Sequence, residues 1–219
     1  MIDSKSTRVP DESMNKYSLE LNMIDPLLGE KLSRLYAECS ANQICDLIWT
    51  TGTLYCDANI EIRSMERLRN QTKNVLLAQL SSSGANLSSK DVCKSFVGLA
   101  RMRCEADPQL LDYIDVYLYE TSAQGLSNLI WSLGEMRYTY ADMSLGIRNK
   151  LLFGLQDKAA DFTDQGFSSL MYGLANMDVK WEDDFLSTAT KSALFSILSR
   201  LSLKMSSHAS GVTLYSLGI

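Results

Sequence analysis

Few side chains in this sequence could carry out chemistry. The chain has one histidine, His208, and five cysteines, with no CxxC pair. Ser–His, Cys–His and multi-histidine metal chemistry would all have to centre on that one imidazole. Cys45/Cys56 and Cys93/Cys104 share a spacing of eleven residues, which admits a four-thiolate zinc site. Structural zinc sites usually use ligand pairs about two to four residues apart, so we favour reduced thiols without a metal.

The acidic residues do not form a catalytic pattern either. Glu182, Asp183 and Asp184 follow Trp181 at the expected start of a helix, where carboxylates favour the helix dipole. Asp112 and Asp115 lie three residues apart on a short expected helix, with no sign of the cleft that a general acid and base require. No glycine-rich phosphate-binding loop occurs. We therefore expect no enzyme and no cofactor.

Composition indicates one helical domain. Of 219 residues, 46% are hydrophobic, 21% are charged and only 3 are proline, which is enough for one domain with a core. No apolar run approaches the roughly 20 residues of a membrane span. The net charge of −5 excludes a basic field over the whole chain. Residues 1–30 are too acidic for a transit peptide, and we expect residues 1–16 to be disordered.

An internal repeat organises the rest of the chain. Five segments align without gaps, and each begins with a hydroxyl residue. These first residues are Ser40, Ser88, Ser122, Thr163 and Ser206, separated by 48, 34, 41 and 43 residues. A Ser or Thr in that place predicts a helix N-cap. Gln43 and Asp91, three residues after Ser40 and Ser88, predict capping boxes.

The columns of this alignment are chemically uniform. The tenth residue after the cap is small: Thr50, Gly98, Ser132, Gly173 or Ser216. The twelfth is Gly or Ala: Gly52, Ala100, Gly134, Ala175 or Gly218. Because glycine lowers helix propensity, its repeated use predicts that another helix passes close by. The ninth residue is Trp49, Val97, Trp131, Tyr172 or Tyr215. For the two tryptophans we expect core packing, with base stacking as the alternative.

Each capped helix is followed by a second periodic segment. These segments are expected at residues 60–80, 108–119, 143–160 and 182–203, with Asp107-Pro108 as a capped start. Asp25-Pro26 opens an earlier partial unit in the same way. The fold class predicted for residues 17–219 is therefore all-α, an α-solenoid of helix–turn–helix repeats about 34–48 residues long. It has about four repeats and a truncated fifth. Because Ile219 falls inside that fifth unit, we expect the sequence to be part of a longer array.

Two segments carry a resemblance to a known family. QGLSNLIWSLGEM and QGFSSLMYGLANM resemble the first-helix motif of octotricopeptide and heptatricopeptide repeat proteins. That group includes the Fas-activated serine/threonine kinase-like proteins and others with a C-terminal RAP domain. The resemblance covers residues 40–219, most clearly 121–178. It implies an organellar protein, mitochondrial or chloroplast, that binds single-stranded RNA in RNA processing, stability or translation. No RAP domain is present, so no nuclease activity is implied.

The resemblance also implies candidate RNA-binding residues. One surface of the stacked first helices is thought to face RNA, and the matching residues lie sixth after the cap. They are Asp46, Lys94, Asn128 and Ser169, of which Asn128 agrees best with the motif. The alternative is that each is an ordinary solvated position.

Two arginines are further candidates. Arg63 and Arg67 are helical neighbours that could touch phosphate, or could form a solvated face with Glu66. The competing hypothesis for the whole chain is a protein-binding scaffold of the HEAT or armadillo kind. Such a scaffold could be part of a ribonucleoprotein complex. The acidic net charge favours that hypothesis. Neither hypothesis involves a membrane or a small-molecule substrate.

Overall fold

The computed structural model describes residues 31, 34, 38–58, 65–81, 87–180 and 186–217. All regular structure in these residues is helical, which confirms the predicted all-α class. The α-helices are α2 (Ala41–Ala58), α3 (Met65–Ser81), α4 (Ser89–Arg101), α5 (Pro108–Tyr117), α6 (Ala123–Glu135), α7 (Leu145–Asp157), α8 (Asp164–Asn176), α9 (Thr188–Leu201) and α10 (Ser207–Ser216). Short 3₁₀ helices are η1 (Leu118–Glu120), η2 (Tyr140–Asp142) and η3 (Ala159–Asp161). Residues 1–16 and Asp25-Pro26, for which we made predictions, lie outside the described residues.

The predicted hydroxyl caps are confirmed at all five helix starts. The Oγ atoms of Ser122 and Ser206 accept hydrogen bonds from backbone N–H groups three residues later, at 3.1 and 3.2 Å. Thr163 does the same at 3.0 Å. The capping box of Ser88 is complete, and Ser40 N donates to Gln43 Oε1 at 2.9 Å. Each cap satisfies N–H groups that the helix itself leaves without a partner, which fixes where each unit begins.

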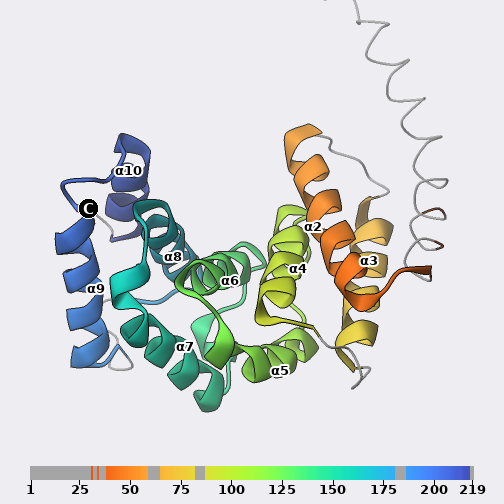
Figure 1. Ribbon diagram of the computed structural model, residues 1–219, viewed down its shortest axis with the longest axis horizontal. Coiled ribbons are helices and arrows are strands. Elements are labelled where there is room, and N and C mark those ends of the chain that lie inside the picture. Colours follow the sequence, from red (N-terminus) through yellow and green to blue (C-terminus); the bar gives the residue numbers. More distant parts are fainter. Residues whose placement is uncertain are drawn as a thin grey trace, which may run out of the picture.

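The helices form two ordered rows. Helices α2, α4, α6, α8 and α10 pack side by side in that sequence, and we call them the A row. Helices α3, α5, α7 and α9 also pack in sequence, and we call them the B row. Both rows follow a curved path, with the A row on its inner side (Figure 1). The cap-bearing helices, which hold the candidate residues, therefore share one layer.

Glycines bring the A-row backbones into contact, as the small-residue columns predicted. A Cβ atom added at Gly52 would lie 2.7 Å from the Cα of Gly98, across the α2–α4 contact. A Cβ added at Gly134 would lie 2.7 Å from the carbonyl oxygen of Gly173, across the α6–α8 contact. Because no side chain fits between these backbones, the paired A-row helices pack at a close distance.

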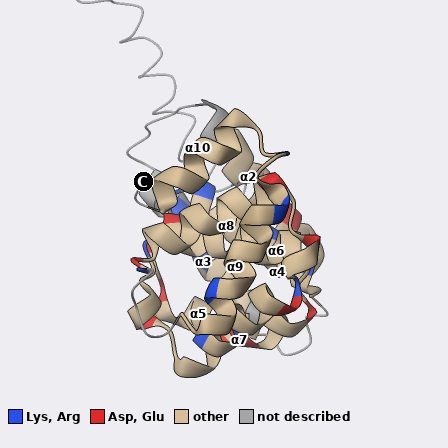
Figure 2. Cartoon of the chain, turned by 90° about the vertical axis from the view of Figure 1, so that its left-hand side faces the viewer, with Lys and Arg blue, Asp and Glu red and all other residues tan. Residues whose placement is uncertain are grey.

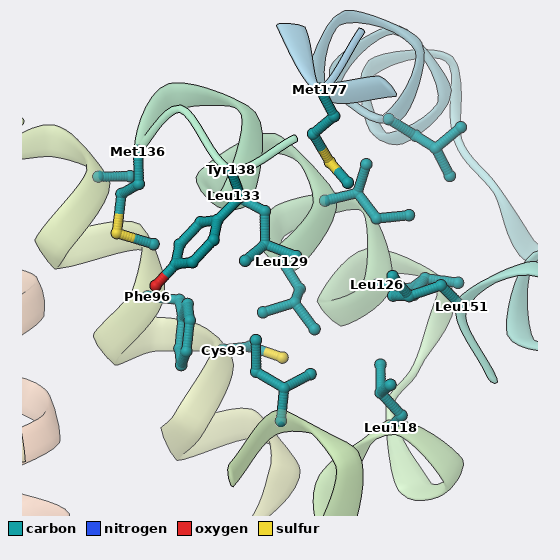
Figure 3. Close-up of a cluster of buried hydrophobic side chains, with 14 of the residues drawn as sticks. Cys93, Phe96, Leu118, Leu126, Leu129, Leu133, Met136, Tyr138, Leu151 and Met177 are labelled. Carbon is teal, nitrogen blue, oxygen red and sulfur yellow. The ribbon is translucent and has the colours of Figure 1, made fainter. Parts of the chain in front are cut away.

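One continuous core joins the two rows. Tyr138 and Phe96 are among its largest fully buried side chains. Figure 3 shows part of it, with residues from both rows meeting: Cys93, Phe96, Leu118, Leu126, Leu129, Leu133, Met136, Tyr138, Leu151 and Met177. Burial of this apolar surface is the main force that holds each unit to the next.

Two B-row helices begin later than predicted. Helix α7 starts at Leu145 because Ser144, in an extended conformation, accepts from Ile147 N at 3.3 Å. Helix α9 starts at Thr188 because Ser187 caps it through Thr190 N at 3.1 Å. The prediction of a start at residue 182 is therefore wrong. A capping serine therefore sets the first residue of a helix, whereas acidic residues alone do not. Residues 181–185, including the acidic trio, lie outside the described residues.

Candidate functional site

The four candidates in the sixth column lie on successive A-row helices. Asp46 on α2 and Lys94 on α4 are brought together, with Lys94 Nζ donating to Asp46 Oδ1 at 2.8 Å. This hydrogen bond raises the pKa of the Lys94 ammonium group. The pair is largely solvent-exposed, so it contributes little stability. Its consequence is electrostatic, since the nearest carboxylate offsets the positive charge of Lys94.

Asn128 and Ser169 lie farther along the same row. Asn128 on α6 is half-buried, and its Oδ1 accepts from Gln124 Nε2 at 2.9 Å. Ser169 on α8 is also half-buried and lines a groove described below. An amide and a hydroxyl of this kind can each hydrogen-bond the edge of a nucleic-acid base.

The structure does not describe the side chains of the two arginine candidates. Arg63 lies outside the described residues. Arg67 belongs to α3 in the B row, and its side chain also lies outside what the structure describes. Helix α3 packs against α2 and α4 as part of the B row. The predicted phosphate contact by these two residues therefore stays a prediction.

The aromatic residues of the ninth column lie nearer the surface than predicted. Trp49 is 41% exposed and Tyr215 is 72% exposed, while Trp131 and Tyr172 are half-buried. The expectation of core packing is wrong for Trp49. Residues of the ninth column lie one helical turn after those of the sixth column, on the same face of each A-row helix. Among the described helices, no second layer packs on that face. Trp131 meets the expectation in part, because it packs against the core while staying accessible.

A groove lies across α6, α8 and α10. It has a volume of about 510 Å³ and is lined by Trp131, Ser169, Tyr172, Glu135, Asp164 and His208, among others. It unites the sixth and ninth columns of consecutive helices. No lysine or arginine lines it. His208 is exposed, as predicted.

Charge on the A row is mixed. Lys90, Lys94 and Arg101 all belong to α4, where Arg101 Nη1 donates to Thr53 Oγ1 of α2 at 2.6 Å. Helices α6 and α8 contribute Glu135 and Asp164 instead. In the view of Figure 2, positively and negatively charged residues are scattered among the helices. Recognition on this face would therefore rely on stacking and hydrogen bonding more than on charge.

A second cavity went unrecognised in the sequence. It has a volume of about 890 Å³ and lies at the C-terminal ends of α4, α6 and α8. Its charged lining residues are Arg69, Arg103, Arg137, Glu105 and Glu135. The alignment does bring the arginines into one column, since the fifteenth residue after the cap is Arg103, Arg137 and Asp178 in three consecutive units. Nothing in residue type alone marks that column as structurally unusual.

The described cysteines differ in burial, and Cys39 is only half-buried. Cys45, Cys93 and Cys104 are buried in the core. Burial raises the pKa of Cys93 and of Cys104 to about 12, and raises that of Cys45 as well. Within the residues that the structure covers, no three His, Cys, Asp or Glu side chains are grouped to hold a metal ion. The side chain of Cys56 lies outside that coverage. Cys45, Cys93 and Cys104 are therefore core residues whose raised pKa keeps them protonated at neutral pH.

Comparison with known proteins identifies no relative. No protein-family model matches the chain, and no curated protein sequence matches it. Across the described helices, none is both long enough and apolar enough to cross a membrane.

Proposed function

We propose that this chain is a non-enzymatic α-solenoid that binds single-stranded RNA along its A row. The observation that supports the proposal is that a residue of the sixth column lies beside a residue of the ninth column on the same helix. Asn128 with Trp131, and Ser169 with Tyr172, place a polar side chain one helical turn from an accessible aromatic ring. Asp46 and Trp49 repeat this arrangement on α2.

The order of the helices supports the solenoid part of the proposal. Each A-row helix packs on the next, each B-row helix does likewise, and the close glycine contacts recur at α2–α4 and α6–α8. In a solenoid, equivalent positions of successive units form a line across one face. A flexible strand can then contact the same column of each unit in turn.

The side chains suit an unpaired strand. Every base has a flat face that stacks on Trp or Tyr, at about 1–3 kcal/mol per base. Asn and Ser can hydrogen-bond base edges, which are accessible only in single-stranded RNA. The absence of a basic strip on the described A row means that affinity per unit is small and accumulates over several units.

The cellular role follows from the resemblance. The motif segments QGLSNLIWSLGEM and QGFSSLMYGLANM are similar to those of organellar RNA-binding repeat proteins. We therefore infer a role in RNA processing, stability or translation in a mitochondrion or chloroplast. Fluorescence microscopy of the tagged gene product tests the location, and an exclusively cytosolic signal would contradict it.

RNA binding can be tested directly with the full chain. We expect a dye-labelled mixed 20-residue RNA to bind, and Trp fluorescence to fall as bases stack. Trp131→Ala with Tyr172→Ala should weaken binding about tenfold or more, since each lost stack costs about 1–3 kcal/mol. Phe153→Ala is the matched control, because Phe153 is a 58% exposed aromatic on α7 of the B row. Equal losses in both variants, or no binding by the wild type, would overturn the proposal.

One observation favours a protein ligand instead. The groove across α6, α8 and α10 combines Trp131 and Tyr172 with the carboxylates of Glu135 and Asp164. Aromatic faces beside carboxylates also suit a Lys or Arg side chain of a protein partner. In a competition assay, displacement of the RNA by an arginine-rich peptide would indicate a shared face. A peptide that binds while RNA does not would establish the scaffold alternative.

A further inference from the structure

The cavity at the C-terminal ends of α4, α6 and α8 contains three arginines from three parts of the chain. Arg69 comes from α3, Arg103 from the segment after α4, and Arg137 from the segment after α6. Arg103 and Arg137 are exposed. Among the described residues, neither of these two has a carboxylate within ion-pair distance, although Glu105 and Glu135 also line the cavity.

Arg103 and Arg137 occupy an unfavourable backbone conformation. Their φ angles are 56° and 63°, in the left-handed region where helices usually end on glycine. Arg103 N donates to Ala100 O at 2.8 Å and Cys104 N to Leu99 O at 3.0 Å. These two bonds are a Schellman motif, and Arg137 with Tyr138 repeats it after α6.

The arginine side chains are not needed to end the helices. Backbone N–H groups already satisfy the terminal carbonyls of α4 and α6. Glycine would form the same turn without steric strain. Asp178 after α8 makes the same turn, with φ 57°, so the turn itself does not require a cation. The geometry of the turn therefore does not by itself determine the positive charge at two consecutive units.

This cavity borders the face assigned to RNA. Glu135, in the last turn of α6, lines both the arginine cavity and the groove that contains Trp131 and Tyr172. A strand whose bases stack in the groove would carry its phosphates to one edge of the A row. Neighbouring packed helices are about 8–10 Å apart, so consecutive arginines recur at a spacing that a flexible strand can follow.

We propose that Arg103 and Arg137, together with Arg69, bind phosphodiester groups of the RNA strand at this edge. The proposal rests on the proposed function and adds a cationic contact beside the groove across α6, α8 and α10, whose described lining has no lysine or arginine. The guanidinium fork matches two phosphate oxygens, which favours arginine over lysine at such a site. Because the contact is to phosphate, it carries no sequence information.

The backbone conformation provides a variant that is expected to fold. Arg103→Gly with Arg137→Gly removes both charges and places the preferred residue in each left-handed turn. Asp178→Gly is the matched control, since it relieves the same strain one unit later without removing a cation. The thermal midpoints of both variants should equal or exceed that of the wild type.

RNA binding by the full chain then tests the site. For Arg103→Gly/Arg137→Gly we expect about tenfold weaker binding at 50 mM salt, equally for two unrelated RNA sequences. The slope of log K against log salt should fall in magnitude by about 1.4, which corresponds to two single-strand phosphate contacts. Asp178→Gly should bind as tightly as the wild type or more tightly, with the slope unchanged.

The failures are distinguishable. If the double arginine variant binds with the wild-type affinity and slope while Trp131→Ala/Tyr172→Ala loses binding, the phosphate site is wrong and RNA binding stands. If the wild type binds no RNA, both proposals fail. A thermal-denaturation titration with pyrophosphate then shows whether the cavity binds a small anion. Thermal stabilisation of the wild type alone would assign the cavity to a small phosphate ligand instead of a strand.

Discussion

At the scale of single residues, the Asp46–Lys94 pair offsets part of the positive charge that the A row presents. Its distance of 2.8 Å and its exposure make it a weak structural contact. We predict that Asp46→Asn changes the free energy of unfolding by less than about 0.5 kcal/mol. RNA affinity at low salt should rise about two- to fivefold, because the ammonium group loses its neutralising partner.

The control for this prediction has the same change in net charge. Asp112→Asn removes one exposed carboxylate from α5, in the B row. Fluorescence anisotropy with one labelled RNA should show a gain for Asp46→Asn and little for Asp112→Asn. Equal gains would mean that only the total charge matters and that Lys94 has no local role.

A second residue-scale prediction concerns Tyr138, which joins consecutive units. Its hydroxyl donates to Asp107 O at 2.6 Å and accepts from Asp107 N at 2.7 Å. Asp107 in turn caps α5. We expect Tyr138→Phe to lower the free energy of unfolding by about 1–3 kcal/mol, because two backbone groups of Asp107 lose their partner. Urea denaturation measures this, and Tyr215→Phe at an exposed site should cost under about 0.5 kcal/mol.

At the scale of the helices, the glycine contacts hold the A row together. A Cβ added at Gly98 would lie 2.6 Å from the carbonyl carbon of Ile48, and one at Gly173 would lie 2.5 Å from the carbonyl oxygen of Ile130. Backbone atoms at these points cannot move aside as side chains can. We predict that Gly98→Ala or Gly173→Ala destabilises the chain by about 1–3 kcal/mol.

The opposite result is expected at a glycine without such a neighbour. Gly211 lies in α10, and nothing lies within 4 Å of an added Cβ there. Gly211→Ala should therefore stabilise the chain by up to about 1 kcal/mol through helix propensity alone. Stabilisation by all three substitutions in thermal denaturation would show that neighbouring A-row helices do not make close backbone contact.

These helix-scale features differ in how well the sequence predicts them. The cap residues and the small columns were predictable, because capping and close packing each restrict residue type at one position. The exposure of Trp49 was not, since helical periodicity defines a face without showing whether another layer covers it. The left-handed turns at Arg103 and Arg137 gave no signal of their own, because the usual glycine is absent.

The candidate site was also predictable only in part. The sixth and ninth columns follow from the alignment, yet the groove across α6, α8 and α10 depends on how successive units are rotated against each other. The arginine cavity combines the B-row helix α3 with the C-terminal ends of three A-row helices. Such contacts are distant in sequence, and no local pattern determines them.

At the scale of the whole molecule, the buried thiols link stability to pH. Burial raises the pKa of Cys93 and Cys104 from an ordinary value of about 9 to about 12. In the unfolded chain these thiols ionise near pH 9, whereas in the folded chain they keep their protons up to about pH 12. The stability that the protonated thiols provide is therefore complete below pH 9 and is lost as pH rises from 9 to 12.

The expected loss is about 1.4 kcal/mol per pH unit for each thiol in that window. Tyr138, whose pKa is also raised by burial, acts in the same direction. Urea midpoints measured from pH 7 to 11 should therefore be level up to about pH 9 and then fall. Cys93→Ala should lower stability at pH 7 through lost packing, yet its curve should fall less steeply above pH 9 because one titrating thiol is gone. Parallel curves for the variant and the wild type above pH 9 would contradict the prediction. They would show that the buried Cys93 thiol ionises as readily in the folded chain as in the unfolded one.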